Sequence, residues 1–314
     1  MLYRRMPKNG DEVSILGLES MRLAQKDGRI DEERATRHLR GAIDCGVNYV
    51  DTAWPYHDGE CEPFLGRALE GGYRERVHLA TKLPCWLVQR ADDLDGFLNS
   101  QLQRLNTRRI DYYLLHSLSA ASWDRLSELA IVDFLSRAKA AGKIVNVGFS
   151  CHATQPKFHH LVDAYPWEFC QLQFNFLDME HQASEEGLRY AAAKGLGVMV
   201  MHPLRGGALA SAPPAVQAIW DEAATPRKPA EWALRWLWNH PEVTVVLCGI
   251  NEEWQIEENL AVAAQAYPNS LTEAELALIC RAARQYRDLN KLERPVCQGC
   301  GDHGVVRRNK RPGS

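Results

Sequence analysis

Residues 49–60 read YVDTAWPYHDGE, and this stretch contains the pattern from which the fold can be inferred. An apolar run that begins at Val47 ends abruptly at the carboxylate of Asp51, and Tyr56 follows in a segment too polar to be core. A short buried strand that runs into a polar loop is typical of α/β proteins, whose loops often carry function. A helix cap or a loop hydrogen bond would also account for these residues, so the rest of the chain must decide.

Other runs along the chain share this strand-like character. Together with the first they are 15–20, 47–52, 77–83, 111–117, 143–150, 168–175, 196–204 and 243–250. Several are almost continuously apolar, as expected for strands covered on the outside by helices. Amphipathic segments that predict helices lie between them, at 31–46, 91–106, 122–142, 183–195 and 229–240. Strand–helix units repeated in this way along 314 residues predict an α/β fold, a (β/α)8 TIM barrel.

An open doubly wound sheet is the alternative fold. Such sheets usually bind dinucleotides through a G-x-G-x-x-G turn, and no predicted strand here is followed by one. The segment 211–228, rich in Pro and Ala, is either a mobile flap on the barrel or a plain connector. We expect the barrel to span residues 1–290 and a short polar and basic tail to occupy residues 291–314.

The composition excludes several classes of function. The net charge is −3 and there is no basic stripe, so nucleic acid is not an expected partner. No uninterrupted apolar window of about 18 residues exists, so no membrane span is expected. The N-terminal residues are charged and lack the apolar region of a secretory signal. The 9 cysteines are scattered, and we therefore expect reduced thiols and a cytoplasmic protein.

Ionisable side chains stand at the ends of three consecutive predicted strands. Asp51 ends one strand and has Tyr56 on its loop, Lys82 ends the next, and His116 ends the third. In a barrel these strand ends meet on one face, and buried charges are costly unless they are paired. Each residue alone is better explained as an ion pair or a capped strand end, whereas the set together predicts a catalytic site.

This set of residues suits the transfer of a proton to a carbonyl oxygen. A free tyrosine has a pKa of about 10, and a nearby cation stabilises the phenolate and lowers that pKa. We expect Lys82 to supply the cation, Asp51 to hold Lys82 in place, and His116 to orient the carbonyl oxygen. Tyr56 would then act as a general acid, and a nicotinamide cofactor would have to supply the hydride.

The motifs that surround these residues resemble those of the aldo-keto reductase family, over roughly residues 10–290. They are D-T-A-x-x-Y at Asp51 to Tyr56 with Glu60 after it, LGRAL at 65–69, T-K-L at 81–83 and L-H at 115–116. The resemblance implies a TIM barrel that binds NAD(P)H without a Rossmann motif. It implies that the four residues above are a catalytic tetrad, with Tyr56 as the proton donor in the reduction of an aldehyde or ketone to an alcohol.

The resemblance also implies a set of cofactor contacts, in which the first strand end, the loop after the seventh strand and the end of the eighth strand take part. They are Ser20, Met21, Ser150, Cys151, Gln173, Met201, Pro203, Leu204, Gly206, Gly207, Gly249, Ile250, Asn251, Gln255, Glu258 and Asn259.

The chain departs from the family pattern at several of these cofactor positions. Glu19 stands where a second glycine is usual, and Cys151 stands where an asparagine is. The cations that grip the 2′-phosphate of NADP in many relatives are replaced by Gly249 and Gln255. Without a cation the 2′-phosphate gains less on binding. We expect NADPH as the cofactor, with NADH as the alternative.

Two tryptophans are candidates for the substrate site. Trp54 and Trp86 follow the second and third predicted strands, where they would wall a small carbonyl substrate. The alternative is that they pack against neighbouring loops. A different function, a nucleotide-binding regulatory or scaffold barrel with little turnover, is the alternative to a reductase.

The predicted tail resembles part of a ferredoxin-like segment that follows the barrel in one subgroup of the family. Cys297 and Cys300 match the first two positions of its C-x₂-C-x₂-C-x₃-C motif, but His303 and Arg307 occupy the other two. A four-iron cluster normally requires four cysteines. The segment is therefore interpreted as truncated or degenerate, and we assign no metal to it.

Overall fold

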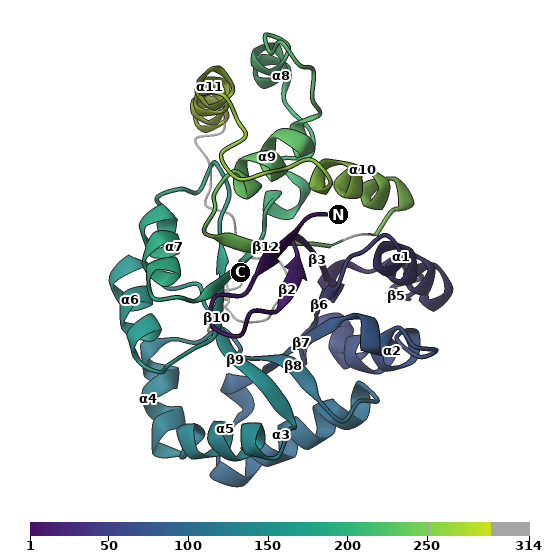
Figure 1. The fold of residues 1–314 in the computed structure, drawn as a ribbon, viewed down its shortest axis with the longest axis vertical. Helices are drawn as coiled ribbons and strands as arrows, with labels where there is room; N and C mark the ends of the chain where they lie inside the picture. Colours follow the sequence, from purple (N-terminus) through teal and green to yellow (C-terminus); the bar gives the residue numbers. More distant parts are fainter. Residues whose placement is uncertain (250, 290–314) are drawn as a thin grey trace, which may run out of the picture.

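The computed structural model describes residues 1–249 and 251–289. Eight parallel strands close into a barrel in the order β10-β11-β12-β3-β6-β7-β8-β9. Figure 1 looks along this barrel. These strands are β3 (Leu16–Glu19), β6 (Tyr49–Asp51), β7 (His78–Leu83), β8 (Ile110–Leu115), β9 (Ile144–Ser150), β10 (Phe169–Gln173), β11 (Gly197–Met201) and β12 (Val243–Cys248). Each predicted run overlaps one of them, and the predicted (β/α)8 barrel is confirmed.

Helices surround the barrel on the outside (Figure 1). They are α1 (Glu32–Asp44), α2 (Cys61–Ala68), α3 (Ala91–Arg104), α4 (Ala120–Glu128), α5 (Ile131–Ala140), α6 (Gln155–Asp163), α7 (Ser184–Ala193), α8 (Pro214–Trp220), α9 (Pro229–Trp238), α10 (Glu253–Ala263) and α11 (Glu273–Leu289). The prediction of one helix over 122–142 is wrong. Ala130 takes a left-handed φ of 60°, which a continuous helix does not allow, so two helices form. The segment 211–228 contains α8, which packs against α11.

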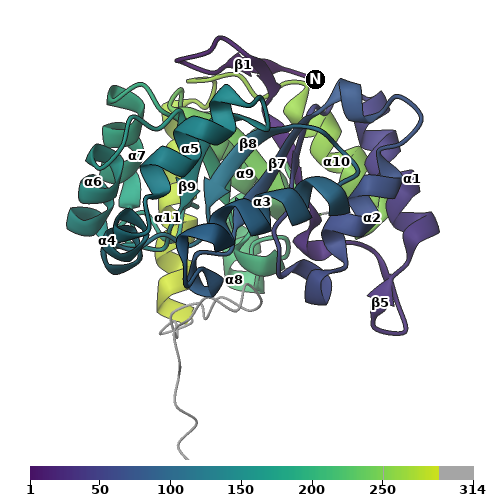
Figure 2. The same ribbon diagram turned by 90° about the horizontal axis from the view of Figure 1, so that it is seen from below.

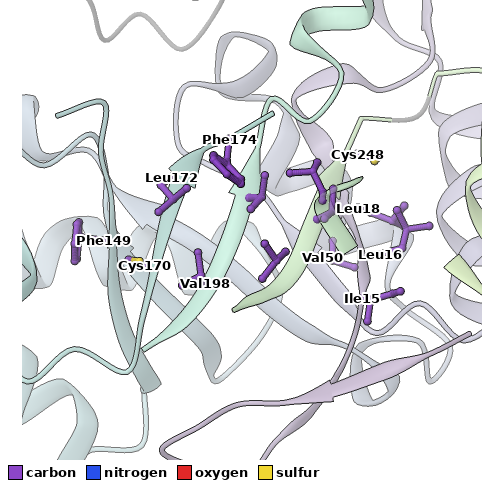
Figure 3. Packing of buried hydrophobic residues seen from close by; sticks show 14 of the residues in the cluster. Ile15, Leu16, Leu18, Val50, Phe149, Cys170, Leu172, Phe174, Val198 and Cys248 are labelled. Atoms are coloured by element: carbon purple, nitrogen blue, oxygen red, sulfur yellow. The ribbon is translucent and has the colours of Figure 1, made fainter. Parts of the chain in front are cut away.

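Side chains alternate between the two surfaces of the barrel wall. On β12, Val245 and Leu247 belong to the cluster inside the barrel, whereas Val246 and Cys248 pack in the outer cluster under the helices. Figure 3 shows part of this outer layer, including Leu18, Val198 and Cys248. Burying one such aliphatic side chain contributes roughly 1.5–3 kcal/mol. The two layers together hold the strand ends in fixed positions.

The two ends of the barrel differ in what covers them. The hairpin of β1 (Tyr3–Arg5) and β2 (Glu12–Ser14) covers the end where the barrel strands begin, and Met6 and Val13 pack into the interior cluster there. The hairpin of β4 (Gln25–Lys26) and β5 (Arg29–Ile30) follows the C-terminal end of β3. Figure 2 shows β1 and β5 at opposite ends of the molecule. Barrels of this kind carry their active sites at the C-terminal ends of the strands, here the β5 end.

Short 3₁₀ turns follow several strands at this end, namely η1 (Ser20–Arg22), η2 (Tyr56–Gly59), η4 (Cys85–Leu87) and η5 (Arg205–Gly207), while η3 (Arg74–Arg76) precedes β7. Over residues 1–249 and 251–289, no helix has the length and apolar character needed to cross a membrane. The tail predicted at 291–314, with Cys297 and Cys300, lies outside the described residues.

Candidate active site

Strand alternation places three of the four predicted catalytic residues. Asp51, Lys82 and His116 each come two residues after an inward-facing side chain of β6, β7 or β8. Because side chains of a strand repeat their direction every second residue, these three are directed into the barrel mouth. All three are almost fully buried. The strands therefore bring together residues that are distant in the sequence.

Lys82 lies at the centre of the four predicted catalytic residues, Asp51, Tyr56, Lys82 and His116, which are called the catalytic cluster below. Its Nζ lies 2.5 Å from Oδ2 of Asp51, and it donates to the carbonyl oxygen of Thr52 at 2.8 Å and to the hydroxyl oxygen of Tyr56 at 3.3 Å. A buried ammonium needs a partner for each of its three donors, and these contacts provide them. Burial, opposed by Lys82 and assisted by Glu19, raises the pKa of Asp51 to about 6.

Tyr56 is presented by a tight turn after β6. His57, Asp58 and Gly59 all have left-handed φ values, of 50°, 54° and 90°. Residues other than glycine adopt this conformation only uncommonly, and such backbone is concentrated at functional sites. Arg104 of α3 holds the turn in place, since it donates to the carbonyl oxygen of Gly59 and lies 4.3 Å from the ring centroid of Trp54. The neighbouring helix thus determines where the phenol lies.

A buried polar network supports Lys82 from the helix side. The carboxylate of Glu62 on α2 is fully buried, accepts hydrogen bonds from Thr81 at 2.7 Å and Gln101 at 2.8 Å, and pairs with Arg104 at 2.9 Å. Gln101 also donates to the carbonyl oxygen of Lys82 at 3.0 Å. Burial raises the pKa of Glu62, which its hydrogen-bond partners oppose. The same network therefore fixes both the Lys82 backbone and the turn that carries Tyr56.

The sequence motifs include Glu60 and indicate no role for Glu62. Glu60 is exposed, whereas Glu62 shares the buried face of α2 with Leu65. Residues three apart lie on the same side of a helix. This spacing relative to an apolar residue was the signal that could have identified Glu62.

His116 lies beside Tyr56 with its ring uncharged. Burial lowers the pKa of His116 well below its ordinary value, and the charges of Lys82 and His152 act in the same direction. The ring centroids of His116 and Tyr56 are 6.3 Å apart. A neutral imidazole donates one hydrogen bond and accepts another. It can therefore orient a polar ligand atom near the phenol without adding a second positive charge to the cluster.

The two predicted substrate tryptophans have different surroundings. Trp86 is 42% exposed and its ring centroid lies 5.2 Å from that of His116, so it borders the open side of the cluster. Trp54 packs edge-to-face against Phe97 of α3 at 5.1 Å and lies under Arg104. The contacts of Trp54 therefore serve the turn that carries Tyr56, while Trp86 faces the cluster.

A groove of about 260 Å³ adjoins the cluster between the ends of β3, β11 and β12. The predicted cofactor contacts that line it are Met21, Pro203, Leu204, Gly206, Gly207, Gly249, Asn251, Gln255, Glu258 and Asn259. It reaches the cluster at Glu19, which lies in register with Asp51 on the neighbouring strand. A second hollow of about 650 Å³ shares Ala230, Glu258 and Asn259 with it. The two form an elongated space of the kind that an extended dinucleotide needs.

The remaining predicted cofactor contacts are buried at strand ends and are not among the described residues that line this groove. They are Ser20, Ser150, Cys151, Gln173 and Met201. Gln173 donates to Asp178 at 3.2 Å and accepts from Gln182, and Ser150 accepts from the backbone N–H of Ser117 at 2.9 Å. Ile250 lies outside the described residues.

The loop after β11 offers backbone rather than side chains to the groove. Arg205, Gly206 and Gly207 have left-handed φ values of 53°, 70° and 98°, and Arg205 pairs with Asp178 at 3.2 Å, which fastens the loop. Glycine allows the backbone to approach a ligand closely, and backbone amides in such turns bind anions. These residues fit the diphosphate of a nicotinamide dinucleotide. Arg22 also lines this groove, and sequence analysis did not identify it.

Comparison with known proteins relates the chain and its barrel to one family. A sequence model described as "Aldo/keto reductase family" matches residues 15–279, which contain all four cluster residues. An uncharacterized oxidoreductase of Bacillus subtilis is 30% identical over 230 residues, 67% of this chain and 68% of that protein. A 6-dehydroglucose reductase of Novosphingobium aromaticivorans is 28% identical over 277 residues, 82% of this chain and 88% of that protein. A solved structure of an aldo-keto reductase from Bacillus halodurans, in its holo form, is 25% identical with a TM-score of 0.75, covering 90% of this chain and 96% of that one.

Proposed function

The chain belongs to the aldo/keto reductase family and is an oxidoreductase, and we propose that Tyr56 is its proton donor in reducing an aldehyde or ketone with NADPH. One observation carries this proposal. The phenol of Tyr56 contacts the Lys82 ammonium, which is in turn held by the buried carboxylate of Asp51. The arrangement places an acid next to a fixed positive charge at the mouth of the barrel.

The protein's part in the reaction is the handling of one proton. A bound reduced nicotinamide supplies the hydride to the carbonyl carbon. Tyr56 donates its proton to the carbonyl oxygen as negative charge develops there, and the Lys82 ammonium, 3.3 Å from the phenol oxygen, stabilises the phenolate that remains. Asp51 and the Thr52 carbonyl already hold that ammonium, so it need not move. His116, being neutral, donates a hydrogen bond that orients the same carbonyl oxygen.

Aldo/keto reductases use NAD(P)H, and for this chain we propose NADPH, with NADH as the alternative. Gly249 and Gln255 supply no charge for a 2′-phosphate. Lys228 lies where the groove continues outward and pairs there with Glu258, so it would contact a 2′-phosphate only by exchanging that partner. Titration with NADPH and NADH, followed by quenching of tryptophan fluorescence, tests this choice. A lower Kd for NADH than for NADPH would replace NADPH in the proposal.

The proposed substrate is a small carbonyl compound that reaches Tyr56 past Trp86, whose exposed ring forms one wall. Trp54, which packs on Phe97, would contribute indirectly by supporting the turn. We also propose a cytoplasmic location, supported by the 7 described cysteines, all of which are free thiols.

Replacement of Tyr56 by Phe tests the proton donor. General acid catalysis typically contributes about 10²- to 10⁴-fold, so kcat for carbonyl reduction should fall by about that factor. The ring remains, so the Kd for NADPH should change by less than about twofold. Tyr49→Phe is the matched control, because Tyr49 is buried inside the same barrel and outside the cluster. This control variant should keep its activity.

Two results would contradict the proposal in different ways. Unchanged kcat in the Tyr56→Phe variant would show that another group donates the proton. Tight nucleotide binding by the wild-type protein without turnover of any aldehyde or ketone in a broad panel would favour a regulatory or scaffold barrel.

A further inference from the structure

Arg22 crosses the groove from one strand end to another. It is the last residue of η1, directly after β3, and is exposed. A Cβ placed on Gly249, at the end of β12, would lie 2.7 Å from the Cβ of Arg22 and 3.3 Å from its Cγ and Cδ. A Cβ placed on Gly206, in η5, would lie 3.5 Å from Nη2 of Arg22. The stem of Arg22 therefore passes over Gly249, and its guanidinium reaches the loop after β11.

Arg22 also brings a positive charge to this groove. It is the one lysine or arginine among the described residues that line the groove, and within residues 1–249 and 251–289 it forms no ion pair. The cations of the adjoining hollow are already paired, since Lys228 contacts Glu258 and Arg227 contacts Glu231 and Glu275. A guanidinium with unused donors in an open groove suits a phosphate ligand, which it binds through charge-assisted hydrogen bonds.

We propose that Arg22 binds the diphosphate of the nicotinamide dinucleotide, an assignment that rests on the proposed function. Its guanidinium lies at Gly206, where the left-handed loop leaves room for a phosphate to approach the backbone. The 2′-phosphate is expected farther along the groove, near Gln255. The positive charge also offsets Glu19, whose carboxylate lines the same groove and would otherwise repel the phosphates.

The proposal explains why glycine follows the last residue of the eighth strand, β12. The φ of Gly249 lies outside the left-handed region, so its backbone would accept other residues. What prevents a side chain there is the Cβ of Arg22, 2.7 Å away, which is closer than two such atoms can approach. Positions 22 and 249 therefore exclude each other, and only one of them can carry a side chain into the groove. In this chain Arg22 occupies the space.

Replacement of Arg22 by Met tests the charge, because Met keeps much of the aliphatic stem. Loss of a charge-assisted contact to phosphate should raise the Kd for NADPH and for NADH alike, by about 10- to 100-fold. The increase of Kd with salt concentration should become shallower. Arg22→Lys should retain most of the affinity. Arg29→Met is the matched control, because Arg29 is exposed on β5 and outside this groove, and it should change Kd by less than about twofold.

A charge swap tests the mutual exclusion. Arg22→Gly should weaken nucleotide binding as Arg22→Met does. Adding Gly249→Lys to Arg22→Gly removes the clash and returns a cation from the other strand. Because a cation at this position contacts the 2′-phosphate in many relatives, this double variant should recover part of the affinity for NADPH. Gly249→Lys alone should bind more weakly than wild type, because Arg22 still fills the space. Circular dichroism and Tm of each variant establish that it is folded before Kd is compared.

The outcomes separate this inference from the proposed function. If the wild-type protein binds neither NADPH nor NADH, the proposed function fails. If the wild type binds them and a folded Arg22→Met variant binds them equally well, the assignment of Arg22 fails while the proposed function stands. A loss of affinity for NADPH alone would place the guanidinium on the 2′-phosphate and overturn its assignment to the diphosphate.

Discussion

His116 and Asp51 make the stability of the protein depend on pH in opposite directions. Burial lowers the pKa of His116 well below its ordinary value of about 6.5. Below about pH 6.5 the imidazole of His116 is protonated in the unfolded chain but stays neutral in the folded protein. His116 therefore lowers the free energy of unfolding as the pH falls below about 6.5. Asp51 has a folded pKa of about 6, above its unfolded value of 3.8. The folded protein holds its proton between these values, so Asp51 contributes stability as the pH falls from 6 to 3.8.

A His116→Asn variant isolates the histidine's share of this pH dependence. Between about pH 7 and about pH 5, the free energy of unfolding of the variant should fall less than that of the wild type. Asp51 is present in both proteins, so its opposing contribution largely cancels in the difference. Urea unfolding at each pH provides the measurement. The same fall in both proteins would show that folding leaves the pKa of His116 unshifted.

The gathering of Asp51, Lys82 and His116 could be predicted from their places at strand ends, whereas the contacts of the residues around them could not. Asp51, Lys82 and His116 each end a strand, and a barrel brings strand ends together whatever the loops do. Helical spacing indicates that Glu62 is buried. The partners of Glu62 and the reach of Arg22, however, depend on where a side chain goes after it leaves its own element. Arg22 reaches across to Gly249, 227 positions away by the printed numbering, and no local pattern marks such a contact.

Helices α2 and α3 approach each other closely at Gly66. A Cβ on Gly66 would lie 2.5 Å from the carbonyl oxygen of Arg104, so these helices pack backbone to backbone. Gly66→Ala should force them apart and lower the free energy of unfolding by about 1–3 kcal/mol. It should also lower kcat, because Arg104 holds the turn that carries Tyr56.

Gly41→Ala is the matched control for this substitution. Gly41 lies within α1 and a Cβ there meets nothing within 4 Å, so alanine should stabilise the protein by about 0.5–1 kcal/mol. Guanidinium unfolding of both variants and steady-state assays give the comparison. Equal effects of the two alanines on stability would mean that α2 can move away from α3 at little cost.

Element types were predictable where a pattern runs over several residues, and boundaries were not. The leucines at 94, 98, 102 and 105 have helical spacing, and α3 covers all but the last of them. Over 122–142 the amphipathic pattern continues through the break between α4 and α5. The break depends on the left-handed backbone of Ala130, a residue that normally favours helix, so its composition gave no warning.

At the scale of the whole molecule, packing that stabilises the fold and the predicted catalytic cluster lie at opposite ends of the barrel. Met6, at the end covered by β1 and β2, packs against Gly197, where β11 begins, while the catalytic cluster lies at the opposite strand ends. Met6→Ala should leave a cavity and lower the free energy of unfolding by about 2–5 kcal/mol. The Kd for NADPH, measured well below Tm, should stay within about twofold of wild type. A large rise in Kd would show that the two ends of the barrel are coupled.

The barrel itself was predictable because eight apolar runs alternate with amphipathic segments, and few folds bury so many nearly continuous apolar strands. The hairpins at its two ends were not predicted. Their strands have 2 or 3 residues, too few to show the alternation that identifies a strand. One of these hairpins, β4–β5, comes soon after η1 in the chain. It therefore borders residues that line the groove, although its strands are too short for a sequence pattern to predict.

The exclusion between positions 22 and 249 also bears on how such a site can change by descent. A lineage with lysine at the end of the eighth strand cannot gain Arg22 in one step, because the two Cβ atoms would collide. The lysine must first give way to glycine, and that intermediate has neither the lysine that contacts the 2′-phosphate in many relatives nor Arg22 for the diphosphate. Each route between the two arrangements therefore crosses a protein that holds its cofactor weakly. We expect descendants that have acquired Arg22 to keep it, because the reverse change would pass through the same weakly binding intermediate.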